Sequence, residues 1–129
     1  MVEVSLLAPW MLLMFAAIFD FGMYSRALIM VENAARAAVL ETSMSVDAAD
    51  DSYLACRVVR SQLKTTANAG KLSSCDAAPL VVSVASGVDS EGFATSRVSV
   101  AYNTPPMFAL PFMPGKMTLT RTAEMRVKP

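Results

Sequence analysis

Histidine does not occur among the 129 residues of the chain. Its absence removes the commonest metal ligand, the usual general base near neutral pH and the usual haem ligand. The chain has no glycine-rich phosphate loop, and its side chains offer no set of nucleophile, base and acid. Acidic pairs such as Asp50 with Asp51 and Asp89 with Glu91 share only their closeness in sequence. The sequence therefore predicts a protein that is not an enzyme and that has no cofactor or metal site.

Charge of one sign is not in excess, because 11 basic residues balance 11 acidic ones. A nucleic-acid-binding domain usually carries a clustered basic surplus. We therefore expect no nucleic acid among the partners of this protein.

Cysteine is scarce, and the two cysteines, Cys56 and Cys75, form no CxxC motif. Two thiols alone make a poor zinc site. In a chain whose N-terminus looks exported, a single disulfide is the expected state, and it would stabilise the fold by about 3 kcal/mol. The alternative is a pair of buried free thiols in a cytosolic protein.

What the chain does have is one long apolar stretch at its N-terminus. Residues 4–24 contain a single charge, Asp20. As a helix they would span roughly 31 Å, close to the thickness of a bilayer's hydrocarbon core. The stretch is longer than the apolar core of a cleaved signal peptide, and no small-x-small cleavage site follows it. Residues 4–24 are therefore predicted to cross a membrane.

The helical pattern continues past the apolar stretch without glycine or proline, so we predict one helix over residues 2–43. Its second half is amphipathic, with an i, i+3, i+4 stripe that consists of Ala27, Val31, Ala34, Ala35 and Ala38. This stripe is expected to carry a folded head. The sequence thus divides into a hydrophobic helix over residues 1–43 and a globular head over residues 44–129.

Three residues interrupt the apolar half of this helix. Glu3 is expensive to bury, and a simple anchor more usually begins with a basic residue on its cytoplasmic side. Pro9 removes a backbone donor, which predicts a kink or local melting. Asp20 lies either at the far membrane interface, near Tyr24 and Arg26, or opposite a basic group of another subunit.

The head is predicted to be α+β. Residues 45–70 are expected to form a second helix, capped by Ser45 or Asp47 and ended by Gly70. Residues 79–86, 96–102 and 116–127 alternate with period two and predict a three-stranded antiparallel sheet, which the amphipathic half of the long helix would cover. In the last strand Met117, Leu119, Ala123, Met125 and Val127 would share the apolar face. Asp89 and Glu91 are interpreted as solubility residues in the turn between the first two strands.

The segment between the last two strands, residues 103–116, contains four prolines and is strongly apolar. Prolines exclude it from a strand ladder. Either it is buried against a partner, or it folds back over the core of its own sheet. Its apolar residues are Met107, Phe108, Leu110, Phe112 and Met113.

The first forty residues resemble the N-terminal segment of TadE-like pilins, which are relatives of the type IV pilins. The features that carry the resemblance, in order, are Glu3, Pro9, Asp20-Phe21-Gly22, Tyr24 and Asn33-Ala34-Ala35-Arg36. The apolar insertion before a last strand that ends in AEMRV is also similar to that family.

The resemblance implies a subunit made with a basic leader, which a prepilin peptidase removes on the cytoplasmic side. The subunit then waits in the inner membrane until the pilus assembly machinery adds it to an extracellular filament with its copies. Because no leader precedes it in the sequence, Met1 is expected to be either the first residue after processing or the start of a shortened chain. In related pilins the glutamate is the fifth mature residue, whereas here it is the third, which bears on where cleavage falls and on whether Met1 supplies the partner amine. In a dry bundle Glu3 would pair with the α-amino group of Met1 on an adjacent subunit, which would fix the axial register. The residues expected at subunit contacts are Met1, Glu3, Pro9, Asp20, Gly22 and Arg26.

Two functions are thus compatible with the sequence. The first is a structural pilin subunit, whose small residues would let neighbouring helices approach closely. The second is a single-pass membrane protein that displays a small extracytoplasmic binding domain, and it predicts that Glu3→Ala is tolerated.

Overall fold

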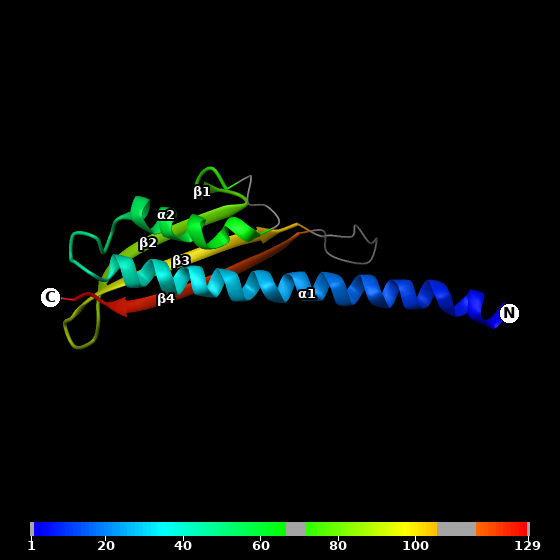
Figure 1. Cartoon of the computed structure of the whole chain (residues 1–129). Helices are drawn as coiled ribbons and strands as arrows, with labels where there is room; N and C mark the ends of the chain where they lie inside the picture. The colour runs from blue at the N-terminus through cyan, green and yellow to red at the C-terminus, as the bar shows by residue number, and fades with distance from the viewer. Residues whose placement is uncertain (1, 67–71, 106–115, 129) are drawn as a thin grey trace.

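The computed structural model describes residues 2–66, 72–105 and 116–128. A single helix, α1, runs from Val2 to Thr42 and extends well beyond the rest of the molecule at its N-terminal end (Figure 1). The predicted range of 2–43 is confirmed to within one residue. The helix is continuous through Pro9, so the predicted local melting there is wrong, and the alternative, a kink, stays a prediction.

The second half of α1 belongs to the core of the head. All five residues of the predicted stripe, from Ala27 to Ala38, are buried, and Val39 is buried beside them. Alanine at most of these positions lets the helix axis lie close to the sheet. The small side chains therefore set how closely the two layers pack.

The sheet has four antiparallel strands in the order β1-β2-β3-β4. They are β1 (Asp76–Ala77), β2 (Leu80–Val88), β3 (Ala94–Thr104) and β4 (Met117–Arg126). The prediction of three strands missed β1, because a two-residue strand has no alternation to detect and exists only through its pairing with β2. The fold class, α+β with a long N-terminal helix, is confirmed.

On the inner face of the sheet, apolar residues of neighbouring strands lie directly opposite one another. Leu80, Tyr102 and Leu119 align across β2, β3 and β4, and Val82 aligns with Val100. All five are buried. The predicted apolar face of the last strand is confirmed at Leu119, at the half-buried Ala123 and at Val127, which directly follows β4, whereas Met117 and Met125 are 42% and 39% exposed.

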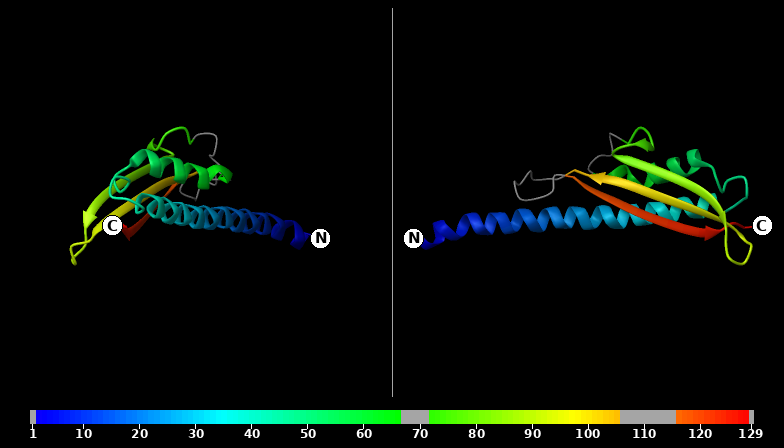
Figure 2. Two further views of the ribbon diagram at one scale, coloured as in Figure 1. Left: turned by 60° about the vertical axis from the view of Figure 1, so that its left-hand side comes forward. Right: turned by 180° about the vertical axis from the view of Figure 1, so that it is seen from behind.

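The two layers are visible from behind in Figure 2, where the strands lie in front of α1. Figure 1 shows α2, which runs from Ser52 to Gln62, above the second half of α1 and over β2. The opposite face of β4 is exposed and polar, as the alternation predicts. On this face the hydroxyls of Ser99 and Thr122 lie 2.8 Å apart, and Arg97 bonds Glu124.

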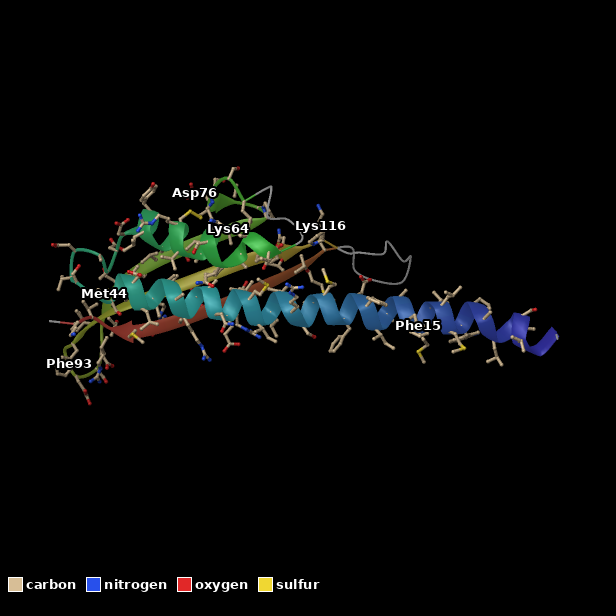
Figure 3. All side chains as sticks on the ribbon, in the orientation of Figure 1. Phe15, Met44, Lys64, Asp76, Phe93 and Lys116 are labelled. Carbon is tan, nitrogen blue, oxygen red and sulfur yellow. A yellow bond between two sulfur atoms is a disulfide. The ribbon has the colours of Figure 1, made fainter. Side chains whose placement is uncertain are left out.

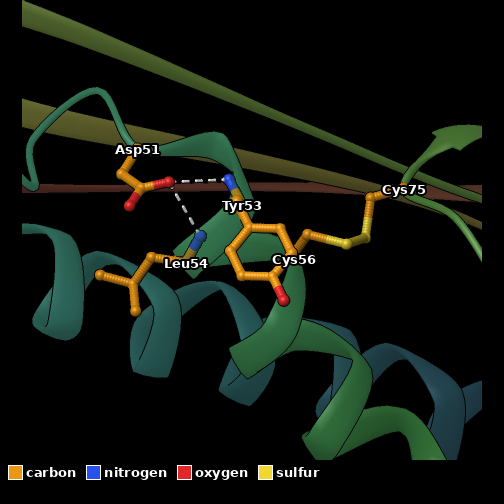
Figure 4. Close-up of a disulfide and its surroundings, with 5 residues drawn as sticks. All are labelled: Asp51, Tyr53, Leu54, Cys56 and Cys75. Carbon is orange, nitrogen blue, oxygen red and sulfur yellow. Dashed lines mark hydrogen bonds between the residues drawn. A yellow bond between two sulfur atoms is a disulfide. The ribbon is translucent and has the colours of Figure 1, made fainter.

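The second helix is shorter than predicted. The Asp51 side chain accepts hydrogen bonds from the backbone N–H groups of Tyr53 and Leu54 at 2.9 and 3.0 Å, so Asp51 is the cap and not Ser45 or Asp47 (Figure 4). Before the cap, the Ser96 hydroxyl donates to the Ala49 carbonyl, which holds this segment against the sheet as a series of turns. After α2, a 3-10 turn over Leu63–Thr65 leads into extended backbone at Thr66, and Gly70 lies outside the described residues.

Two further contacts close the head. Cys56 on α2 and Cys75 beside β1 form the predicted disulfide, with their Cα atoms 5.8 Å apart (Figure 4). At the far end, the Lys128 N–H donates to the Ser43 carbonyl at 2.8 Å, and the buried hydroxyls of Thr42 and Ser96 lie 2.8 Å apart. The end of α1 is therefore tied to both β3 and the C-terminal residues.

Candidate functional site

The most unusual surface of the molecule is the part of α1 that extends beyond the head. We call residues 4–23 the bare rod. None of its side chains is buried, and Trp10, Phe19 and Phe21 are 67%, 61% and 71% exposed. Figure 3 shows its side chains, among them Phe15, pointing outward around the helix. In the described part of the chain α1 is the one helix that is long and apolar enough to cross a membrane.

The predicted assembly residues are distributed along α1. Pro9 and Gly22 lie on the exposed surface of the bare rod, and a Cβ added at Gly22 would meet open space. The Glu3 backbone lies within the helix, and Met1 is outside the described residues. The predicted interface residues from Met107 to Met113 are outside the described residues as well.

Asp20 and Arg26 both line a pocket at the place where α1 enters the head. We call it the proximal pocket. It has a volume of about 280 Å³, and its walls come from α1, from the 3-10 turn and from the facing ends of β3 and β4. Its apolar lining includes Phe21, Tyr24, Met30, Tyr102 and Met117.

Asp20 faces the head because it lies on the same side of the helix as Tyr24, Ala27 and Val31. The successive steps in this series are four, three and four residues, which is the spacing of one helix face. Asp20 is half-buried, whereas Arg26 is exposed. One predicted position for Asp20, at the membrane interface, is compatible with this place at the base of the head. The other, opposite a basic group of a second subunit, remains a prediction.

Tyr102, which contributes to the wall of the proximal pocket, has a polar atom that the sequence pattern did not single out. The residue is 1% exposed, and its hydroxyl is buried with no hydrogen-bond partner among the described residues. A buried hydroxyl without a partner costs about 1–3 kcal/mol. The hydroxyl is inaccessible from the pocket, whose lining is mainly apolar.

At the opposite end of the sheet, the turn between β2 and β3 presents an aromatic residue and a charge cluster. We call residues 89–93 the distal turn. Arg126 of β4 bonds Asp89 at 2.7 Å and Glu91 at 2.5 Å, and its guanidinium lies 4.9 Å from the centre of the Phe93 ring. The positive φ of 84° at Gly92 is a conformation that side-chain-bearing residues rarely adopt.

These contacts revise the role of the two acids in the turn. Asp89 and Glu91 were expected only to aid solubility, but both bind Arg126. The Arg126 hydrogen bond is the main cause that lowers the pKa of Asp89 below its ordinary value, with help from the Ser90 N–H and hydroxyl. The hydrogen bonds of Arg126 with Asp89 and, next, with Glu91 raise the pKa of its guanidinium. The distal turn is thus held in one conformation by β4.

Metal binding has no support from the geometry of residues 2–66, 72–105 and 116–128. Within these ranges no three His, Cys, Asp or Glu side chains lie close enough together to hold a metal ion.

The fold and its exposed surfaces define a small α+β head on an apolar helix, an arrangement that fits a membrane-anchored protein. Residues 1–40 match the family model described as TadE-like protein, which confirms the resemblance for this part of the chain. The match covers the bare rod and most of the helix that enters the head. Together, the match and the apolar helix fit a pilus-related protein. No curated protein and no solved structure matches the chain.

Proposed function

We propose that the protein is a structural pilin subunit, which polymerises through α1 into an extracellular bacterial filament. The observation that carries this proposal is the bare rod together with the TadE-like family match that covers it. Thirteen large apolar side chains between Val4 and Met23 are exposed. At about 1.5 kcal/mol for each such side chain, removing them from water is worth on the order of 20 kcal/mol, more than the whole stability of a typical domain.

A surface of that size needs a cover at every stage of the protein's life. The inner membrane is the cover before assembly, because the apolar stretch matches the thickness of its hydrocarbon core. In the filament the cover is a bundle of the same helices from other copies, with the heads outside. The family match over residues 1–40 supports this second stage, because it spans the rod itself.

Glu3 gives the bundle its register in this proposal. A carboxylate inside a dry bundle is tolerated only when a cation accompanies it, and breaking such a pair costs about 3–5 kcal/mol. The proposed cation is the α-amino group of Met1 on an adjacent subunit. A charge pair that forms at only one axial offset then selects that offset from the many that apolar contacts alone would allow.

The proposed partners are further copies of this chain, the inner membrane, a prepilin peptidase and the pilus assembly machinery. No nucleic acid and no cofactor takes part. The protein has a structural role and no catalytic one.

The alternative is a single-pass membrane protein that displays the head as a binding domain. The exposure of the bare rod favours it as much as it favours a pilin, because a bilayer alone would cover that surface. The two functions differ in what they require of Glu3. A monomer would keep this carboxylate at the aqueous interface, where no partner is needed.

The test is electron microscopy of material sheared from cells that express the wild type, Glu3→Ala or the control Glu41→Ala. Intact mass and N-terminal sequencing then identify the main protein in the sheared material. We expect filaments of this chain from the wild type and the control, and at least about a hundredfold fewer or none from Glu3→Ala, since a loss of about 3–5 kcal/mol at each contact weakens that contact by more than about a hundredfold. Equal amounts of membrane-inserted protein in all three strains would show that the loss is one of assembly. A wild type that stays in the membrane without filaments would refute the pilin function and favour the anchored binding domain.

A further inference from the structure

Phe93 is an exposed aromatic residue that packs on the Arg126 guanidinium and leaves much of its surface in water. It lies in the distal turn with 54% of its surface in water, and its neighbour at the end of β2, Val88, is 73% exposed. Met44, at the end of α1, is 66% exposed. Figure 3 shows Phe93 and Met44 at the end of the head farthest from the N-terminus. Contiguous apolar surface that is rimmed by charge commonly marks a protein interface.

The proximal pocket lies at the other end of the same sheet. Lys116, which directly precedes the Met117 that lines the pocket, is labelled at that end in Figure 3. A cavity of about 150 Å³ is large enough for a benzene ring. The 280 Å³ of the proximal pocket therefore accommodates the side chain of a phenylalanine.

The two ends are complementary in charge. The distal turn contributes Asp89 and Glu91, which outnumber the one cation that binds them, Arg126. The proximal end carries Arg26 and Lys116, which outnumber Asp20. One end is therefore net negative and the other net positive, and such surfaces attract each other and fix the orientation of docking.

We propose that the distal turn of one copy docks in the proximal pocket of the next copy, with Phe93 as the inserted side chain. The inference rests on the proposed filament and adds to it a contact between heads. Because the two surfaces lie at opposite ends of one molecule, the contact is heterologous and propagates as an open chain of subunits. The 11 residues of β3 separate the two ends. At about 3.3 Å per residue, β3 is about 36 Å long, and copies joined in this way are offset by roughly that length.

The experiment compares the wild type with Phe93→Ser and with Tyr53→Ser, which removes another aromatic residue that is 77% exposed on α2. Filaments sheared from cells are quantified, and each variant is also purified in detergent to compare its disulfide and its thermal unfolding with those of the wild type. We expect Phe93→Ser to fold normally and to give about tenfold fewer filaments, as loss of an interface anchor does. Tyr53→Ser should assemble like the wild type.

A second measurement locates the partner of the turn. Phe93 is replaced by p-azidophenylalanine, and assembled filaments and detergent-solubilised monomers are illuminated. We expect adducts to the tryptic peptides 27–36 and 117–121, which contain Met30 and Met117, from filaments alone. If the wild type forms filaments and Phe93→Ser assembles as well as it does, the docking is overturned and the pilin function stands. The same holds if the adducts fall only outside the pocket. If the wild type forms no filaments, the proposed function and this inference both fail.

Discussion

Loss of the Cys56–Cys75 disulfide is expected to destabilise the head by about 3 kcal/mol. The two residues are 19 positions apart in the sequence. In the chain-entropy model, a crosslink that closes a loop of about 15–20 residues removes about 3 kcal/mol of unfolded-state freedom. A domain of this size has a total stability of about 5–15 kcal/mol. The head should therefore remain folded without the disulfide, but with a much smaller margin.

The variant is Cys56→Ala with Cys75→Ala in the full chain, purified in detergent. Alanine is chosen because Cys75 is buried, and a serine hydroxyl there would add its own cost. The free energy of unfolding of a small protein falls by about 1–3 kcal/mol for each molar of urea. The urea concentration at which half of the protein is unfolded should therefore fall by roughly 1–3 M. The signal should be the near-ultraviolet circular dichroism of the tyrosines, because the only tryptophan, Trp10, lies in the bare rod and does not report on the head.

The wild type under reducing conditions is the matched comparison, since it loses the same bond without a change of residue. It should unfold at nearly the same urea concentration as the double variant, and the variant itself should not respond to the reductant. A loss below about 1 kcal/mol in both cases would refute the loop-entropy reasoning. Two titratable free thiols in the untreated protein would refute the disulfide itself.

Three further outcomes follow from single contacts. Asp51→Ala should lower the free energy of unfolding by about 1 kcal/mol because it removes the cap of α2, whereas Asp50→Ala should change it little, and urea unfolding checks both. The wild type should have a higher free energy of unfolding than Asp89→Asn, and the difference should be full above the ordinary Asp pKa of 3.8. It should disappear as the pH falls through the lower pKa that Arg126 confers on Asp89 in the folded state, and a difference that grows on acidification would contradict the assignment. Val31→Ala should cost about 1–3 kcal/mol in thermal unfolding, since Val31 is 0% exposed between α1 and the sheet, and a neutral result would mean that the helix does not pack there.

Most of the secondary structure could be predicted from local pattern. The stripe from Ala27 to Ala38 has the spacing of one helix face, and β3 alternates from Val98 to Tyr102, so each element records its own buried face in its sequence. The start of α2 could not be predicted in this way. Ser45, Asp47 and Asp51 are all good caps, and the choice of Asp51 depends on the bond from Ser96 to the Ala49 carbonyl, across 47 positions of sequence. Likewise β1 exists only through its ladder with β2.

The sequence by itself determined the long helix, its apolar half, the two cysteines and the stretch over residues 1–40 that matches the family model, because each of these is a property of neighbouring residues. The predicted roles of Glu3, Pro9, Gly22 and the loop from Met107 to Met113 in assembly stay predictions. Only the tertiary structure decided where Arg126 meets Asp89, Glu91 and Phe93. It also decided that Tyr102 lines the same pocket as Asp20 and Arg26. These groups are separated by tens of residues, and their distances are set by strand register and by the packing of α1 on the sheet, which no local pattern encodes.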